Sequence, residues 1–165
     1  MGPTEELIPN TILQGEQLFE AAINLIIGYA ERELLIFDPS LAIGGYSSLR
    51  RAELLQQFLA KHRGSRLTLL MHDTDHLAQR CPRLMHLLKL FSHSIAVYKT
   101  GEEALVAQDS FVLADGVHYL HRFHVDHARF RYELDNAAAV QPLQERFGQI
   151  LETSTRGLSA TTLGL

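Results

Sequence analysis

Apolar residues recur along the chain at two different spacings, and the alternation between them predicts a layered α/β fold. Between residues 15 and 31 the apolar positions fall three or four residues apart, which is the period of an amphipathic helix. The run 33–38 is short and almost entirely apolar, as is typical of a strand buried on both faces. The same pattern along the chain predicts helices over 15–31 and 48–62, a helix that begins at Pro82 and another over 137–153, with strands over 33–38, 65–73 and 94–99.

The order of these elements predicts how they are connected. Strand, helix, strand, helix and strand follow one another, and crossovers of helical length join strands that run parallel. The strands after residue 100 are separated by short turns, so they must join the sheet antiparallel. We therefore expect one α/β domain over residues 15–154, a mixed sheet flanked by helices, with an N-terminal arm over 1–14 and a flexible C-terminal tail over 155–165.

A hairpin is predicted within the stretch from Ala104 to Asn136. Asp115-Gly116 separates two strand-like runs, FVLA and VHYL, and this dipeptide is a strong signal for a tight hairpin because both turn positions favour φ > 0. A two-residue turn fixes the register of the two strands. The register pairs Ser110 with His121, Gln108 with Phe123 and Val112 with Tyr119, so that Gln108, Ser110 and His121 share one face.

This hairpin resembles the motif-bearing strand of the phospholipase D superfamily, H-x-K-x-x-x-x-D. Asp115 matches the final acid of the motif, whereas Gln108 stands at the histidine position and Ser110 at the lysine position. The Gly-Ser and Asn that often follow the motif are absent, but the later order of elements matches the end of such a domain. The resemblance implies a phospholipase D-like fold. It also implies a homodimer, since family members of this size complete their site by dimerising.

The family's reaction needs a histidine that attacks phosphorus and a lysine that balances charge on the phosphoryl oxygens. Gln108 cannot form a phosphohistidine, and Ser110 carries no charge, so we expect no phosphodiesterase activity from this motif. One alternative stays open. In the predicted register His121 lies across from Ser110 and could replace the missing nucleophile, with Asp115 completing the site, as in a phosphodiesterase or nuclease with a relocated histidine.

Two further groups of polar residues are candidate sites. His72 and Asp73 end a predicted parallel strand, and ligands of open α/β sheets bind beyond the carboxyl ends of such strands. We therefore count His72 and Asp73, with Gln108, Ser110 and His121, as candidate ligand-binding residues. Nine histidines are unusual for 165 residues, and a histidine-rich metal-binding protein is a second alternative, with His124, Asp126 and His127 as ligands for an ion such as zinc.

Charge, cysteine content and hydropathy limit the possible partners and location of the protein. The net charge of −4 gives no overall basic field that would attract nucleic acid, although a phosphate-bearing ligand or nucleic acid stays open. Cys81 is the single cysteine, which excludes an internal disulfide and favours a reducing compartment. No apolar run is long enough for membrane insertion, and no secretion signal is visible.

The sequence as a whole therefore favours a non-catalytic phospholipase D-like domain. We expect it to act in binding or assembly in a bacterial-type cytoplasm, without a cofactor.

Overall fold

The computed structural model describes residues 6–158. Its elements are β1 (Leu13–Gln14), α1 (Glu16–Tyr29), β2 (Glu33–Phe37), α2 (Leu49–Lys61), β3 (Arg66–Met71), α3 (Asp75–Arg80), α4 (Pro82–Leu90), β4 (Ile95–Lys99), the 3-10 helix η1 (Glu102–Val106), β5 (Ser110–Ala114), β6 (His118–His124), β7 (His127–Glu133), α5 (Ala137–Glu152) and β8 (Thr155–Arg156). The helices and strands predicted with stated ranges are all present, with ends that differ by at most two residues.

All the strands form one mixed sheet, in the order β1-β7-β6-β5-β2-β3-β4-β8. The neighbours β2, β3 and β4 run parallel, and every other neighbouring pair is antiparallel. The predicted fold class, an α/β fold with a mixed sheet flanked by helices, is confirmed.

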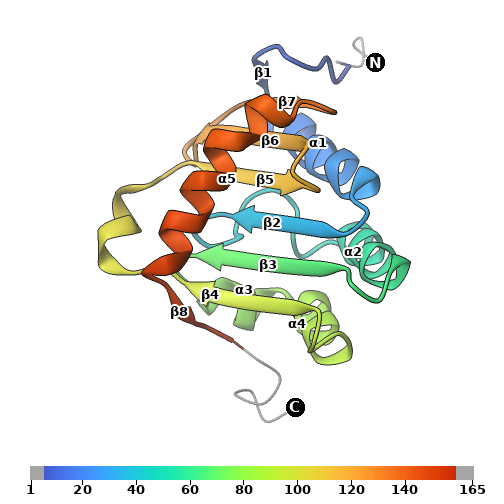
Figure 1. Ribbon diagram of the computed structural model, residues 1–165, viewed down its shortest axis with the longest axis vertical. Helices are drawn as coiled ribbons and strands as arrows, with labels where there is room; N and C mark the ends of the chain where they lie inside the picture. Colours follow the sequence, from blue (N-terminus) through green and yellow to red (C-terminus); the bar gives the residue numbers. More distant parts are fainter. Residues whose placement is uncertain (1–5, 159–165) are drawn as a thin grey trace.

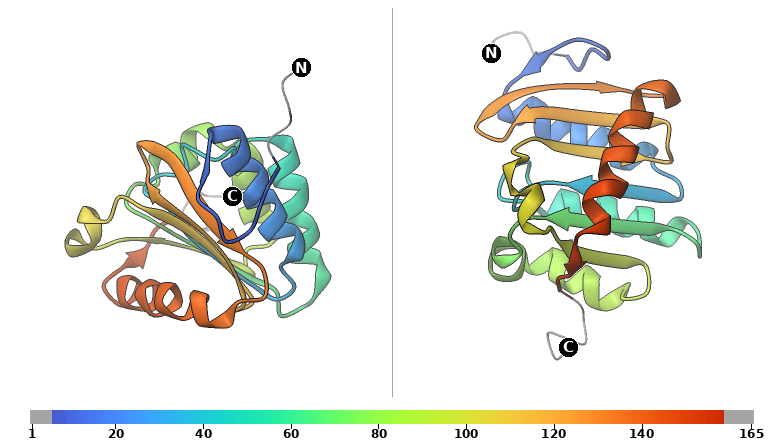
Figure 2. Two further views of the ribbon diagram at one scale, coloured as in Figure 1. Left: turned by 90° about the horizontal axis from the view of Figure 1, so that it is seen from above. Right: turned by 60° about the vertical axis from the view of Figure 1, so that its left-hand side comes forward.

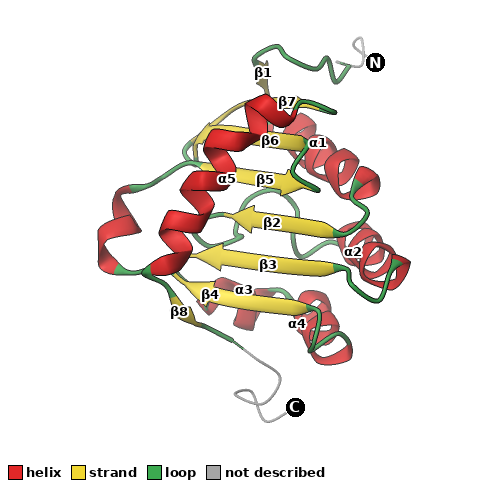
Figure 3. Ribbon diagram, viewed as in Figure 1, coloured by secondary structure: helices red, strands yellow, loops and turns green. Residues whose placement is uncertain are grey.

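Helices cover both faces of the sheet (Figures 1 and 3). The helices α1, α2 and α4 lie on one face, and α5 crosses the other face alone, as the view from above shows (Figure 2). The helix α1 buries Phe19, Ala22, Ile23 and Ile26, whose spacing of three and four residues places them on one side of the helix. On the opposite face Phe147 of α5 packs into a smaller cluster that includes side chains of β2 and β5. We call these two surfaces of the sheet the α1 face and the α5 face.

Local signals in the sequence explain where the helices begin. Ser48, one of two serines at the predicted start of α2, is the N-cap, and its side-chain oxygen accepts a hydrogen bond from Arg51 N at 3.0 Å. Pro82 is the first residue of α4, where its missing N–H costs no helical hydrogen bond. Two helical segments were not predicted, because α3 and η1 are each about one and a half turns long, too short to show a period.

The hairpin between β5 and β6 has a different register from the predicted one. Asp115 and Gly116 have the expected positive φ, 56° and 69°, but Ala114 pairs with His118, so Val117 belongs to the turn. The carbonyl of Val117 instead accepts a hydrogen bond from Asn136 N at 2.7 Å. Since side chains alternate along a strand, this slip by one residue moves partners to opposite faces.

The slip overturns the predicted cluster around Ser110. Ser110 pairs with Arg122, and His121 pairs with Phe111. Ser110 lies on the α1 face with the buried Val112, whereas His121 lies on the α5 face with Tyr119. The prediction that Ser110 and His121 face each other is therefore wrong.

Short strands extend the sheet at both edges. β1 pairs with β7, and β8, formed by the first two residues of the stretch that we predicted as a tail, pairs with β4. Residues 159–165 of that stretch and residues 1–5 of the arm lie outside the described part of the chain. Within residues 6–158 no helix is both long and apolar enough to cross a bilayer.

Candidate functional site

The three motif positions lie in three different environments. Asp115 is in the hairpin turn, Ser110 is the first residue of β5, and Gln108 precedes that strand in the connection from η1. Gln108, Ser110 and Asp115 have the sequence spacing of the family motif, but their side chains do not converge on one point.

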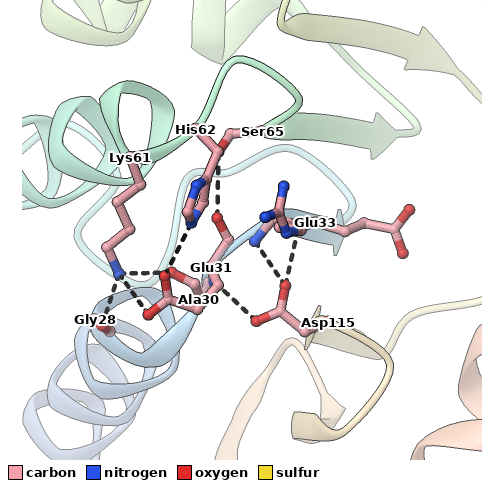
Figure 4. A network of polar contacts seen from close by, with 9 residues as sticks. Gly28, Ala30, Glu31, Glu33, Lys61, His62, Ser65 and Asp115 are labelled. Atoms are coloured by element: carbon pink, nitrogen blue, oxygen red, sulfur yellow. Dashed lines mark hydrogen bonds and ion pairs between the residues drawn. The ribbon is translucent and has the colours of Figure 1, made fainter.

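Asp115 holds the turn between α1 and β2. Its Oδ2 accepts a hydrogen bond from Glu31 N at 2.8 Å, and its Oδ1 accepts from Arg32 N at 2.8 Å and Glu33 N at 3.0 Å (Figure 4). Burial would raise the pKa of Asp115, but these backbone amides favour the charged form and hold its pKa below the ordinary value. Since every hydrogen bond of this carboxylate goes to backbone, Asp115 has a structural role.

Gln108, at the position of the family's nucleophile, is exposed. Its Nε2 donates a hydrogen bond to the carbonyl of Leu105 at 2.9 Å, which ties the side chain back onto η1. An amide has no lone pair that could attack phosphorus as an imidazole does. Gln108 therefore keeps the place of the nucleophile without its chemistry.

Ser110, at the position of the family's lysine, is buried on the α1 face beside Asp38. Burial raises the pKa of Asp38, and this rise is opposed by hydrogen bonds from the backbone amides of Leu41 and Ser40 and by the charge of Arg122. Arg122 is itself buried and bound by Glu16 through two hydrogen bonds of 2.7 and 2.8 Å. Arg122, which pairs with Ser110 across the sheet, is thus already neutralised by a carboxylate.

The α5 face carries a polar cluster of three side chains, one from β6, one from α5 and one from the residue before β5. His121 Nε2 lies 2.7 Å from Asp109 Oδ2, and Arg146 of α5 donates two hydrogen bonds to the same carboxylate, at 2.5 and 2.6 Å. We call Asp109, His121 and Arg146 the Asp109 cluster. Asp109 is 9% exposed, so its charge needs these partners.

Charge inside the Asp109 cluster is balanced. Burial would raise the pKa of Asp109, but the hydrogen bonds and charges of Arg146 and His121 outweigh it and hold the pKa well below its usual range. The bonds to Asp109 in turn raise the pKa of Arg146. The guanidinium and the carboxylate form a two-point ion pair, which leaves His121 as an imidazole oriented by an acid.

Beside this cluster lies an open groove with a volume of about 380 Å³. It is lined by Val106, Ala107, Gln108, Asp109, His121, Phe123 and His124. Val106 and Phe123 are apolar yet 87% and 40% exposed. The Phe123 ring also packs edge-on against His121, with their centroids 5.3 Å apart. The groove therefore combines exposed apolar side chains with a neutralised ion pair.

The wall of the groove is fixed by His72. Its Nε2 lies 2.7 Å from the carbonyl of Ala107, and its Nδ1 lies 2.6 Å from the Thr100 hydroxyl. A carbonyl only accepts, so Nε2 carries the proton and Nδ1 accepts from Thr100. Both ring nitrogens form hydrogen bonds, so His72 fixes the position of the segment around η1. Asp73 instead accepts a hydrogen bond from Asp75 N at 2.8 Å, which stabilises the turn that leads into α3.

The candidate metal ligands form a turn. His124 Nδ1 accepts a hydrogen bond from Asp126 N at 3.1 Å, and the His124 and His127 rings are 5.6 Å apart between centroids. Among residues 6–158 no three His, Cys, Asp or Glu side chains converge as a metal site would require. The structure gives the metal alternative no support.

Sequence reasoning found His121 and Gln108 but missed Asp109 and Arg146. The missed signal is the alternation of side chains along a strand. Asp109 lies two residues before the buried Phe111 and so points to the same face, where a carboxylate needs a cation. Arg146 directly precedes Phe147, one of the apolar residues of the predicted helix, and is the one cation of that helix.

Comparisons with known proteins agree with this fold. A family model described as "Domain of unknown function (DUF7931)" matches residues 14–160. No curated protein sequence matches the chain. The archaeal chromatin protein TrmBL2, whose structure is described as showing a novel mode of DNA binding, is similar with a TM-score of 0.63 at 10% identity, over 88% of this chain and 52% of that one. The chain thus spans about half of TrmBL2.

Two further solved structures share the fold over nearly their whole length. Nuc from Salmonella typhimurium, a phospholipase D family member, gives a TM-score of 0.61 at 12% identity, over 90% of this chain and 99% of that one. NucT from Helicobacter pylori gives 0.60 at 11% identity, over 89% and 98%. The fold is therefore phospholipase D-like, and the chain belongs to the family described as "Domain of unknown function (DUF7931)".

Proposed function

We propose that this protein is a non-catalytic phospholipase D-like domain that acts in binding or assembly, and that its partner docks on the groove beside the Asp109 cluster. The observation that carries the proposal is the dispersal of the motif. Gln108 is tied to the Leu105 carbonyl, and Ser110 is buried on the opposite face of the sheet from His121. At the three motif positions no nucleophile and balancing cation share one site, and phosphoryl transfer needs both.

The surface of the groove suits a protein partner. Exposed apolar patches on a folded domain mark interaction sites, and the exposed Val106 and Phe123 line the same groove as Asp109, whose charge Arg146 balances. The hydrogen bond from His72 to the Ala107 carbonyl fixes this surface before binding, which lowers the entropy cost of docking. We propose a second copy of the chain as the partner, so that the working form is a homodimer with the groove at its interface.

Light scattering on the purified protein tests this proposal. The wild-type chain is expected to be a dimer, and the double variant Val106→Asp/Phe123→Asp is expected to be a monomer, because buried unpaired carboxylates are costly. Leu49→Asp is the matched control, since Leu49 is equally apolar and 57% exposed but lies on α2. A wild-type monomer would refute the dimer, and dissociation of the Leu49→Asp control would remove the groove from the interface.

A phosphodiesterase with His121 as nucleophile is the second candidate, and one observation favours it. Asp109 Oδ2 lies 2.7 Å from His121 Nε2, so Asp109 orients this imidazole as an acid orients a catalytic histidine. A generic phosphodiester substrate, assayed with and without EDTA, separates the two functions. Turnover that His121→Ala abolishes and His72→Ala retains would establish this alternative, whereas we expect no turnover from any of the three proteins.

Two finer points belong to the proposal. A phosphate-bearing ligand such as nucleic acid is supported by the likeness to TrmBL2, whose own structure is described in terms of DNA binding. A bacterial-type cytoplasmic location is supported by Cys81, whose buried thiol is the only one in the chain.

A further inference from the structure

Charge is distributed unevenly along the chain. Residues 54–100 contain seven Lys and Arg against two Asp and Glu, although the whole chain has 15 against 19. This segment forms one side of the molecule: the second half of α2, then β3, α3, α4 and β4 (Figure 1). A protein with a net charge of −4 therefore has one basic side and one strongly acidic remainder.

The basic side chains of this segment gather on α3, α4 and the turns that adjoin them. Arg80, Arg83, His86 and Lys89 are exposed on the helices, and His93 follows α4. Arg63 lies in the turn before β3, whose first residues lie beside those of β4, since Leu67 N donates to Ser94 O at 2.9 Å. We call Arg63, Arg80, Arg83, His86, Lys89 and His93 the basic face.

These cations have no carboxylate partners. Within residues 6–158 Arg63, Arg80, Arg83 and Lys89 form no ion pair, whereas Lys61 and Arg50 on the neighbouring α2 each pair with a glutamate. Arg83 makes one long hydrogen bond, 3.3 Å, to the carbonyl of Ser47. Unpaired exposed cations on a helix remain free to bind an external anion.

The spacing of the cations suits a polymer of phosphates. Arg83 and Lys89 are six residues apart on α4, roughly 9 Å along the axis, and a duplex strand presents a phosphate about every 3.4 Å along its axis. The basic face, whose exposed rings are the imidazoles of His86 and His93, includes no Phe, Tyr or Trp, so contacts to phosphates outweigh base stacking on it. These features favour the backbone of double-stranded nucleic acid, bound without regard to sequence.

The net negative charge does not prevent such contact. Screening limits repulsion to roughly 8 Å at physiological salt, and α5 with its glutamates lies on the other side of the sheet (Figure 2). The acidic remainder instead orients the molecule so that the basic face meets the polyanion.

We propose that the basic face on α3 and α4 binds the phosphate backbone of double-stranded nucleic acid. This inference deepens the proposed binding role and rests on it, but it uses a surface apart from the groove. The groove assembles the protein, and the basic face then contacts the nucleic acid.

Fluorescence anisotropy of a labelled duplex of about two helical turns tests the inference. The wild-type protein is expected to bind non-specifically, with a Kd of about 10⁻⁴ to 10⁻⁶ M that weakens as salt rises. Arg83→Glu is expected to weaken binding about tenfold and to make the salt dependence shallower. It also retains the fold, because an acid in the first turn of α4 favours the helix. Lys89→Gln should weaken binding by a smaller factor.

Arg129→Glu is the matched control, because it changes the net charge equally at an exposed position on β7. We expect it to weaken binding less than about twofold, since screening removes distant charges. The absence of duplex binding by the wild-type protein, or equal losses in Arg83→Glu and Arg129→Glu, would overturn the inference. So would displacement of the duplex by polyglutamate at equal charge concentration, which would favour an acidic protein instead. Light scattering on the same samples separates a failure of assembly from a failure of binding.

Discussion

Two acids of one hairpin show how similar side chains acquire different roles. Asp115 accepts three backbone N–H groups and thereby joins the hairpin to the start of β2. Asp109 joins the same hairpin to α5 through Arg146. The turn role of Asp115 could be predicted from Asp-Gly, but neither set of partners could, because each joins segments more than 30 residues apart.

Asp115→Ala is expected to lower the free energy of unfolding by about 2 kcal/mol or more, since amides bonded to a charged acceptor lose their partner. Asp115→Asn should cost less, because asparagine tolerates the positive φ and keeps one oxygen acceptor. Urea denaturation measures both values. Asp126→Ala, at an exposed turn, is the control, and an equal loss in this control would contradict the role given to Asp115.

The contribution of Asp109 should depend on pH. Its pKa is depressed in the folded protein, so the stability that it contributes is present above the unfolded value of about 3.9 and is lost as the pH falls below it. We expect Asp109→Asn to cost about 2 kcal/mol at neutral pH and less near pH 3. Urea denaturation at both pH values gives the difference. A cost that is unchanged between them would show that the carboxylate charge is not what holds Arg146.

At the scale of elements, the spacing of apolar residues predicted the long helices, which bury one face, and the central strands, which are buried on both faces. It could not predict α3 or η1, which are too short to show a period. The register of the hairpin was wrong because Val117 resembles a strand residue, yet its carbonyl is bonded to Asn136 far along the chain. The candidate site depended on that register, so the error separated Ser110 from His121.

The hydrogen bonds of His72 hold η1 and the residues that follow it in place along one side of the groove before a partner binds. Hydrogen exchange can test this role. His72→Ala removes the contacts to Thr100 and the Ala107 carbonyl, so amides over residues 101–108 should exchange faster. Amides of β2 should keep their wild-type rates, because the sheet is otherwise unchanged. His86→Ala, at an exposed position on α4, is the matched control. Unchanged exchange in the 101–108 segment of His72→Ala would mean that other contacts fix the wall.

For the whole molecule, two layers of helices enclose a sheet of the phospholipase D type in which the motif has been reassigned. The final acid remains as a structural link, the lysine position is buried, and the histidine position borders an apolar groove. From Gln108 and Ser110 the sequence predicts that these two motif positions lack the family's nucleophile and cation, and this stays a prediction about activity. It could not predict the Asp109 cluster, which forms because the residue before β5 meets β6 and α5 on one face.

Mass spectrometry of the intact protein, quenched during incubation with bis(p-nitrophenyl) phosphate, tests the proposed non-catalytic role most directly. A nucleophilic histidine would displace p-nitrophenolate and retain a p-nitrophenyl phosphoryl group on its ring nitrogen. We predict that the wild-type protein keeps its unmodified mass, as His121→Ala does. A phosphoryl adduct that maps to His121 and disappears in His121→Ala would contradict a non-catalytic role.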